Sequence, residues 1–207
     1  MKTLVTAVTL ALAAGTASAG VVFSEGFESG LGQFAYQDYR TQSPSAFAWG
    51  TNEEAGLGNF TGGMGAAAMS NSDGTMGAYD HAIITPPIPL PQGVISMSFL
   101  MNYQNFANLD FADVDVSNDG GASWNNLLRF NDDKGGFFAE PGHAALVDLS
   151  AYAGQTVQVR FHHYDNLDDA FDWYWQVDEF SITAAIPSPG AVALLGAAGL
   201  IACHRRR

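Results

Sequence analysis

The sequence contains almost no cysteine and few basic residues. Its single cysteine, Cys203, lies among the last five residues. A disulfide framework, a cysteine zinc site and a thiol nucleophile are therefore excluded from the body of the chain. Lysine and arginine together number 8 against 21 aspartates and glutamates, which gives a formal charge of −13. Such an acidic excess disfavours binding to nucleic acid and to anionic membrane surfaces.

No apolar run reaches the roughly 20 residues that a stable membrane-spanning helix needs. The N-terminal apolar run, residues 4–14, follows the positive charge of Lys2, and small residues occupy positions 17–19. This order is typical of a secretory signal peptide. We therefore expect residues 1–19 to be a signal peptide that is cut after Ala19, and the remaining chain to be exported.

The C-terminal end has the features of a second targeting segment. A proline motif begins at Pro187, a Gly/Ala-rich apolar run covers residues 190–203, and three arginines at 205–207 end the chain. Arginines in this place remain on the cytoplasmic side of a membrane. The order resembles the PEP-CTERM sorting tail that a membrane exosortase cuts, although Ser188 stands where that family has Glu. The resemblance implies that residues 186–207 hold the protein at the membrane only transiently; an uncleaved anchor is the alternative.

Without its two ends the chain keeps 4 basic and 21 acidic residues, a formal charge of −17. Residues 20–185 form a segment long enough to bury a core without disulfides, so we expect one domain there. Most of its carboxylates are expected to form a solvated surface. The excess of carboxylates favours solubility or the binding of a divalent cation.

Alternation of apolar and polar residues predicts β-strands throughout this segment, with hardly any helical periodicity. The runs that alternate cover residues 95–103, 113–117, 124–130, 156–163 and 174–182. In the second run we expect the valines to face the core and Asp113 and Asp115 to face solvent. The last run changes its apolar parity at Asp178-Glu179, which predicts a bulge or burial on both faces. Short strands joined by Gly, Pro, Asn and Asp turns predict an all-β, antiparallel β-sandwich.

Several short motifs also carry a family resemblance. They are Phe27-Glu28, Ile83-Ile84-Thr85-Pro86, residues 116–124, residues 147–155, Val159-Arg160-Phe161 and residues 174–178. In this order they resemble the MAM-like jelly-roll modules of the choice-of-anchor J type, which are similar to cleaved-adhesin domains. The resemblance covers residues 23–182 and implies a jelly-roll β-sandwich. The polar insertion at 165–172 departs from the family pattern.

The resemblance implies a structural calcium ion, because jelly-roll modules of this kind often hold calcium between their first and last strands. Glu28 and Asp178 are the acidic residues at these places. Calcium takes six to eight oxygen ligands, so two carboxylates and loop carbonyls would suffice. The alternative is that both are ordinary turn or surface residues.

Two further groups of residues invite a chemical interpretation. Asp113 and Asp115 lie two apart in a predicted strand, about 6.6 Å from each other, which is near the carboxylate separations of glycosidases. No Glu-x-Asp-x-x-Glu arrangement accompanies them, and the EF-hand pattern fails at positions 118 and 124. The adjacent His162 and His163 point to opposite faces of their strand, so they do not readily share a metal. His163 falls on the apolar face and is expected to be a hydrogen-bonded core histidine.

Aromatic residues offer a route to ligand binding, because a flat apolar ring beside carboxylates and amides suits a sugar ring. Asp172 ends the acidic insertion, and Trp173 and Tyr174 follow it at a predicted loop edge, where ligand contacts concentrate. We expect these three residues to bind ligand. Trp124 and Trp175 occupy regular strand positions and are expected in the core.

The sequence therefore predicts a non-catalytic, exported bacterial surface or matrix protein that binds polysaccharide and is processed by an exosortase-type enzyme. Two alternatives remain open. One is a carbohydrate-active enzyme that uses Asp113 and Asp115. The other is a calcium-dependent adhesin that binds a surface protein.

Overall fold

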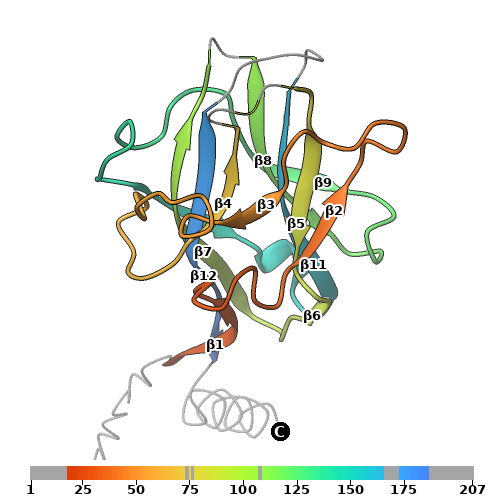
Figure 1. Cartoon of the computed structure of the whole chain (residues 1–207). Coiled ribbons are helices and arrows are strands. Elements are labelled where there is room, and N and C mark those ends of the chain that lie inside the picture. Colours follow the sequence, from red (N-terminus) through yellow and green to blue (C-terminus); the bar gives the residue numbers. More distant parts are fainter. Residues whose placement is uncertain (1–17, 73–74, 76, 107–108, 166–172, 187–207) are drawn as a thin grey trace, which may run out of the picture. The chain divides into compact units, whose positions relative to one another are not determined.

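The chain folds as two antiparallel β-sheets packed face to face (Figure 1). This computed structural model describes residues 18–72, 75, 77–106, 109–165 and 173–186. Residues 21–184 form one compact unit. The predicted all-β, antiparallel β-sandwich of the jelly-roll type is confirmed. Within the described residues, no helix is long and apolar enough to cross a membrane.

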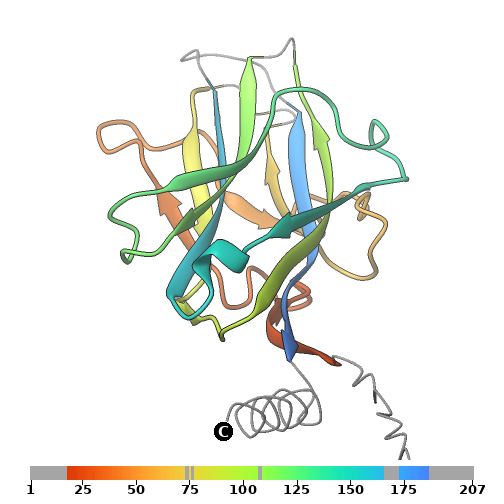
Figure 2. The ribbon, with the colours of Figure 1, turned by 180° about the vertical axis from the view of Figure 1, so that it is seen from behind.

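The first sheet, called the β12 sheet, has six strands in the order β10-β7-β12-β4-β3, with β1 paired to β12. Its strands are β1 (Ser18–Glu25), β3 (Trp49–Thr51), β4 (Ala68–Asn71), β7 (Val94–Gln104), β10 (His143–Asp148) and β12 (Tyr174–Ile186). A 3-10 turn, η1 (Ser150–Tyr152), follows β10. Figure 2 shows β10 and η1 in teal on the near side.

The second sheet, called the β11 sheet, has the order β2-β5-β11-β8-β9, with β6 paired to β11. Its strands are β2 (Ala35–Asp38), β5 (Asp80–Ile84), β6 (Ile88–Pro89), β8 (Asp110–Ser117), β9 (Asn125–Phe130) and β11 (Thr156–Asp165). The proline-rich segment at residues 86–91 contributes only the two-residue strand β6. A proline segment lacks the backbone donors that a central strand needs, which accounts for this short pairing.

The core lies between the two sheets and is built by the alternation that the sequence shows. Ile95, Met97, Phe99 and Met101 on β7 are all at most 2% exposed. The ring centroid of Phe99 lies 5.1 Å from that of Phe161 on β11. Because the two residues belong to different sheets, this edge-to-face contact joins the layers of the sandwich.

Strand β12 changes its pattern where the sequence predicts a change. Up to Asp178 both faces are buried, whereas beyond it Phe180 and Ile182 are buried and alternate with more exposed residues. Glu179, between the two parts, has a positive φ of 51°. This conformation shifts the side-chain parity by one residue, as a bulge does.

The described strands cross both predicted processing boundaries. Strand β1 begins at Ser18, before the expected cut after Ala19, and β12 ends at Ile186, one residue into the predicted tail. Residues 1–17 and 187–207 lie outside the described residues. Removal of the two ends therefore stays a prediction.

Candidate functional site

The outer face of the β11 sheet carries an unusual density of polar and aromatic side chains. On β11, Arg160 and His162 alternate with the buried Val159, Phe161 and His163. The strand register places Arg160 opposite Asp115 and His162 opposite Asp113 on β8. Cross-strand neighbours share one face of a sheet, so these four polar residues meet on the side away from the core.

Asp113 and Asp115 are not solvated, and that prediction is wrong. They are only 4% and 3% exposed. Arg129 holds Asp113 through two hydrogen bonds of 2.8 and 2.6 Å, and the Arg160 Nε donates to Asp115 at 2.8 Å. Long side chains from the neighbouring strands thus cover both carboxylates. The Asp113 hydrogen bonds raise the pKa of Arg129 above its usual range.

The same face brings Asp113, Asp115 and His162 close enough for their ligand atoms to lie within 4.8 Å of one another. The two arginines already neutralise the aspartates, and His162 Nε2 lies 2.6 Å from Asp80 Oδ1. A metal ion would have to displace these partners. Neither carboxylate is free in this arrangement to protonate a leaving group, so the cluster functions as a set of ion pairs.

A depression of about 220 Å³ opens beside these ion pairs. Its lining residues are Gln37, Tyr39, Ile84, Gly120, Gly121, Trp124 and Gln158. We call it the Trp124 depression. It combines two aromatic rings with two amide side chains, the composition in which a few polar groups orient a ligand against an apolar surface.

Arg160 lies against the two aromatic rings that line the Trp124 depression. Its guanidinium carbon lies 4.5 Å from the Trp124 ring centroid and 5.4 Å from that of Tyr39. Its Nη1 also donates to the Tyr39 hydroxyl at 3.0 Å. Stacking and hydrogen bonding together fix a rotamer-rich side chain, so the site is organised before any ligand arrives.

Trp124 is half-buried on this surface, which corrects the expectation that it belongs to the core. It follows the turn of Gly120 and Gly121, whose φ values are 75° and 87°. This glycine conformation turns the chain ahead of β9, which begins at Asn125. Trp175, by contrast, is fully buried as expected.

A second aromatic surface, called the Trp173 cluster, lies where the loops after β7 and β9 meet the start of β12. Phe137 and Phe106 are 56% and 41% exposed, and Trp173 is half-buried. The centroid of Trp173 lies 5.0 Å from that of Phe137 and 6.4 Å from that of Phe106. Phe138 joins them with a positive φ of 48°, an uncommon conformation for a bulky residue.

Of the three residues predicted to bind ligand here, Trp173 lies in this cluster and Tyr174 lies beneath it. Tyr174 is fully buried, so its ring has no face for a ligand, and the expectation of direct contact is corrected. Its hydroxyl donates to Asn102 Oδ1 at 3.0 Å and accepts from the Phe138 N–H at 3.0 Å. Burial raises the pKa of Tyr174 to about 12. Asp172 lies outside the described residues.

Glu28 and Asp178, the predicted calcium ligands, meet the same glycine-rich loop between β3 and β4. The Asp178 carboxylate lies where a Cβ on Gly63 would stand, and the Glu28 carboxylate where a Cβ on Gly65 would stand. Asn59 links both places, because its Nδ2 donates to Asp178 Oδ2 at 2.8 Å and to the Gly65 carbonyl at 3.3 Å.

The chemistry of this donor set fits a hard cation. Asp178 is fully buried, and its burial raises the pKa of the carboxyl above its usual value. Two carboxylates from different segments, both set against one glycine-rich loop, supply oxygen ligands of the kind that calcium accepts.

The interior holds a chain of polar side chains that sequence reasoning found only in part. His163 is a fully buried, hydrogen-bonded histidine as predicted, but its partner His81 carried no sequence signal. The hydroxyl of Ser70 lies 2.8 Å from His81 Nε2 and 2.8 Å from His163 Nδ1. The Tyr79 hydroxyl lies 3.3 Å from His163 Nε2.

The backbone carbonyl at one end of these hydrogen bonds can only accept, and this fixes which group donates in each of the others. His81 Nδ1 donates to the Phe47 carbonyl at 3.0 Å, so His81 Nε2 is an acceptor. Ser70 then donates to His81, His163 Nδ1 donates to Ser70, and Tyr79 donates to His163. This direction of donation requires both histidines to be neutral. Burial lowers the pKa of His81 to about 4 and that of His163 well below its usual value.

Comparison with known proteins shows a likeness in structure only. No family model matches the sequence, and no curated protein matches it. Two cleaved adhesin domains of Lys-gingipain from Porphyromonas gingivalis have TM-scores of 0.57 at 21% and 20% identity; each comparison covers 80% of this chain and 99% of the domain. The C-terminal family 22 carbohydrate-binding module of Clostridium thermocellum Xyn10B has a TM-score of 0.50 at 10% identity, covering 80% of this chain and 95% of that module. The predicted cleaved-adhesin-like fold is confirmed, whereas the choice-of-anchor J and PEP-CTERM assignments stay predictions.

Proposed function

We propose that this chain is a non-catalytic, exported bacterial surface or matrix protein that binds a polysaccharide in the Trp124 depression. The observation that carries the proposal is the pairing of two half-buried aromatic rings, Trp124 and Tyr39, with the amides of Gln37 and Gln158 around one hollow. A sugar ring presents apolar C–H groups on its faces and hydroxyls on its rim. Aromatic and amide side chains are complementary to these two parts.

The charges around the hollow favour a neutral saccharide. Arg160 is paired with Asp115, and Arg129 with Asp113, so the positive charge of each guanidinium is already balanced by a carboxylate. The acidic excess of the whole chain repels anionic polymers as well. The fold likeness to a family 22 carbohydrate-binding module agrees with a binding role on a jelly-roll scaffold.

A glycan array with the exported protein tests this proposal. We expect neutral polysaccharides to be retained without release of products, and Trp124→Ala to lose at least tenfold in affinity. Trp173→Ala is the matched control, since it removes an indole from the other aromatic surface. Release of shortened saccharides would overturn the non-catalytic role. If Trp124→Ala bound saccharide as tightly as the wild type, the Trp124 depression would not be the binding site.

The Trp173 cluster supports a second candidate function, adhesion to a surface protein. Its exposed members Phe106 and Phe137 meet the Trp173 ring in edge-type aromatic contacts. Aromatic residues of this kind are enriched in the centres of protein interfaces. If Trp173→Ala reduces attachment to protein-coated surfaces and leaves glycan binding intact, the cluster is a protein-binding surface; unchanged attachment rejects this function.

We also propose that a calcium ion stabilises the domain through Glu28, Asp178 and carbonyls of the glycine-rich loop. The ion would compensate the buried Asp178 carboxylate. A ligand present at 100 times its dissociation constant adds about 2.7 kcal/mol to the free energy of unfolding. Calcium should therefore raise the melting temperature of the wild-type protein, and Glu28→Gln should reduce that rise. A melting curve that is the same in calcium and in chelator would rule the site out.

The proposal also includes removal of both ends of the chain during export and sorting. Residues 1–19 are proposed to be removed as a signal peptide, and residues 186–207 to be cut by an exosortase-type enzyme. Intact-mass measurement of the protein from its native host should find a species without either end. Recovery of the secreted form with Arg205–Arg207 still attached would contradict the cut at the tail.

A further inference from the structure

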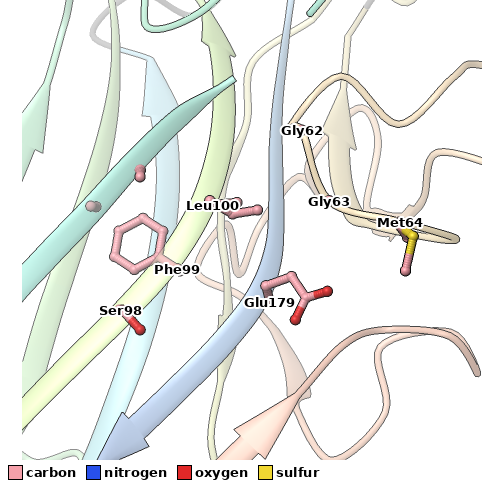
Figure 3. A pocket seen from close by; sticks show the side chains of 9 residues that line it. Gly62, Gly63, Met64, Ser98, Phe99, Leu100 and Glu179 are labelled. Carbon is pink, nitrogen blue, oxygen red and sulfur yellow. The ribbon is translucent and has the colours of Figure 1, made fainter. Parts of the chain in front are cut away.

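A pocket of about 390 Å³ lies on the outer face of the β12 sheet, beside the glycine-rich loop (Figure 3). Met64 of the loop, Leu100 of β7 and Ala144 of β10 contribute apolar side chains to its lining. Glu179 of β12 contributes the only charged side chain. The volume falls at the lower end of the range for ligand pockets, and the lining pairs one carboxylate with an apolar floor.

The backbone at Glu179 shows that its side chain is placed here against a conformational cost. Its φ is 51°, in the left-handed region that glycine occupies without strain. The change of parity in β12 needs only this backbone conformation, so a glycine would serve the bulge better. The side chain of Glu179 is exposed, and Figure 3 shows its carboxylate directed toward the side on which Met64 lies.

Three lysine and arginine residues form ion pairs among the described residues, and none of these pairs is with Glu179. Arg129, Lys134 and Arg160 form theirs with Asp113, Asp132 and Asp115. The carboxylate therefore faces the pocket as a site of negative charge at the end of an apolar surface.

We propose that this pocket binds the lysine or arginine side chain of a basic partner protein. The aliphatic stem of such a side chain covers apolar surface while its charged head reaches a carboxylate. Here the stem would lie on Leu100 and Ala144, and the head would form a charge-assisted hydrogen bond with Glu179.

A protein partner fits better than a free amine because exposed apolar side chains lie both in the pocket lining and next to it. Met64 is 81% exposed and Leu146 is 75% exposed. Leu146 lies opposite the pocket residue Ser98 in the β10–β7 register, so both side chains are on this face. A small amine would leave these apolar side chains in water, whereas a protein surface would cover them. The acidic charge of the chain also favours a basic partner. This inference is independent of the saccharide proposal.

The test is a titration followed by amide NMR on the exported protein with nitrogen-15 label. The probe is a blocked seven-residue peptide with one central lysine flanked by valines, and the control peptide carries norleucine in place of lysine. We expect saturable shifts at Gly62–Met64, Leu100 and Glu179 with the lysine peptide and none with norleucine. Glu179→Gln, which keeps the shape and removes the charge, should weaken binding at least fivefold.

Two more variants separate binding from folding. Glu179→Gly relieves the left-handed strain, so it should melt at the same or a higher temperature and still lose the peptide. Glu53→Gln removes an exposed carboxylate elsewhere and should bind as the wild type does. Equal affinity in Glu179→Gln, or shifts spread over the whole acidic surface, would each overturn the proposal.

Discussion

The inner and outer faces of the β11 sheet differ in how their buried polar groups are satisfied. On the inner face His81 and His163 are fully buried and linked through Ser70 by neutral hydrogen bonds. On the outer face the nearly buried Asp115 is held by the charged Arg160. Between two sheets an uncompensated charge would be very costly, whereas at the edge of solvent a paired charge is tolerated.

This difference has a functional consequence. The inner chain is built from fully buried side chains and ends at the Phe47 carbonyl. The outer arrangement is open, since Arg160 also stacks on the rings of Trp124 and Tyr39 and so shapes a hollow. The first arrangement specifies the core, and the second prepares a surface for a ligand.

The largest expected effect is a loss of folding stability at acid pH, caused by the two histidines of the inner face. Because the pKa of both inner histidines is lowered by folding, the unfolded chain binds more protons below pH 6.5, and stability falls as pH falls toward about 4. Relative to neutral pH, the charging of His81 should cost about 2 kcal/mol at pH 5, since one pKa unit corresponds to about 1.4 kcal/mol, and His163 should add to this loss. Urea unfolding at pH 7.5, 6 and 5 measures this loss.

A matched pair of variants decides whether the inner face is responsible. His163→Gln should flatten the acid dependence, and His162→Gln, on the other face of the same strand, should leave the contribution of the inner pair in place. The carboxylate of Asp38, whose pKa is lowered, loses its contribution only at lower pH, below about 4. A flat stability between pH 7.5 and 5 would contradict the neutral chain.

The next effect concerns the outer ion pair. Arg160→Met leaves Asp115 nearly buried without its cation, and the removal of one partner of such a pair costs about 3 kcal/mol. The double variant Arg160→Met/Asp115→Leu should regain most of that loss, because apolar residues often replace a buried pair without penalty. Unfolding in urea compares the three proteins. A loss of stability below about 0.5 kcal/mol in Arg160→Met would instead support the expectation from the sequence that Asp115 is solvated.

Sequence reasoning succeeded where the cause is local. The alternation of residues 95–103 predicts β7, and the parity change at Asp178-Glu179 predicts the altered geometry of β12, because both depend on neighbours in the chain. It failed for Asp113 and Asp115, whose covering residues Arg129 and Arg160 lie 16 and 45 residues away.

The candidate site was less predictable than the fold for a related reason. Trp124 and Tyr39 come from distant segments, and their shared hollow exists only after β2, β11 and the β8–β9 turn assemble. Glu28 and Asp178 were paired through a family resemblance. The structure brings both carboxylates to one glycine loop, but calcium itself stays a prediction.

The smallest expected effect on stability is that of Trp124→Ala, and it separates the binding surface from the fold. The indole is half-buried at a turn, so its removal opens no central cavity and forfeits mainly its contact with Arg160. A cation–π contact near the surface is worth about 0.5–1 kcal/mol, and we expect a loss of that order in urea unfolding. Trp175→Ala is the matched control from the core, where truncation of a buried aromatic costs about 3–5 kcal/mol. If Trp124→Ala destabilised the protein as much as Trp175→Ala does, the indole would be part of the framework, and a loss of saccharide binding would no longer identify it as a contact. With stability nearly kept and affinity lost at least tenfold, the outer face of the β11 sheet is a surface held ready for a ligand by its own ion pairs.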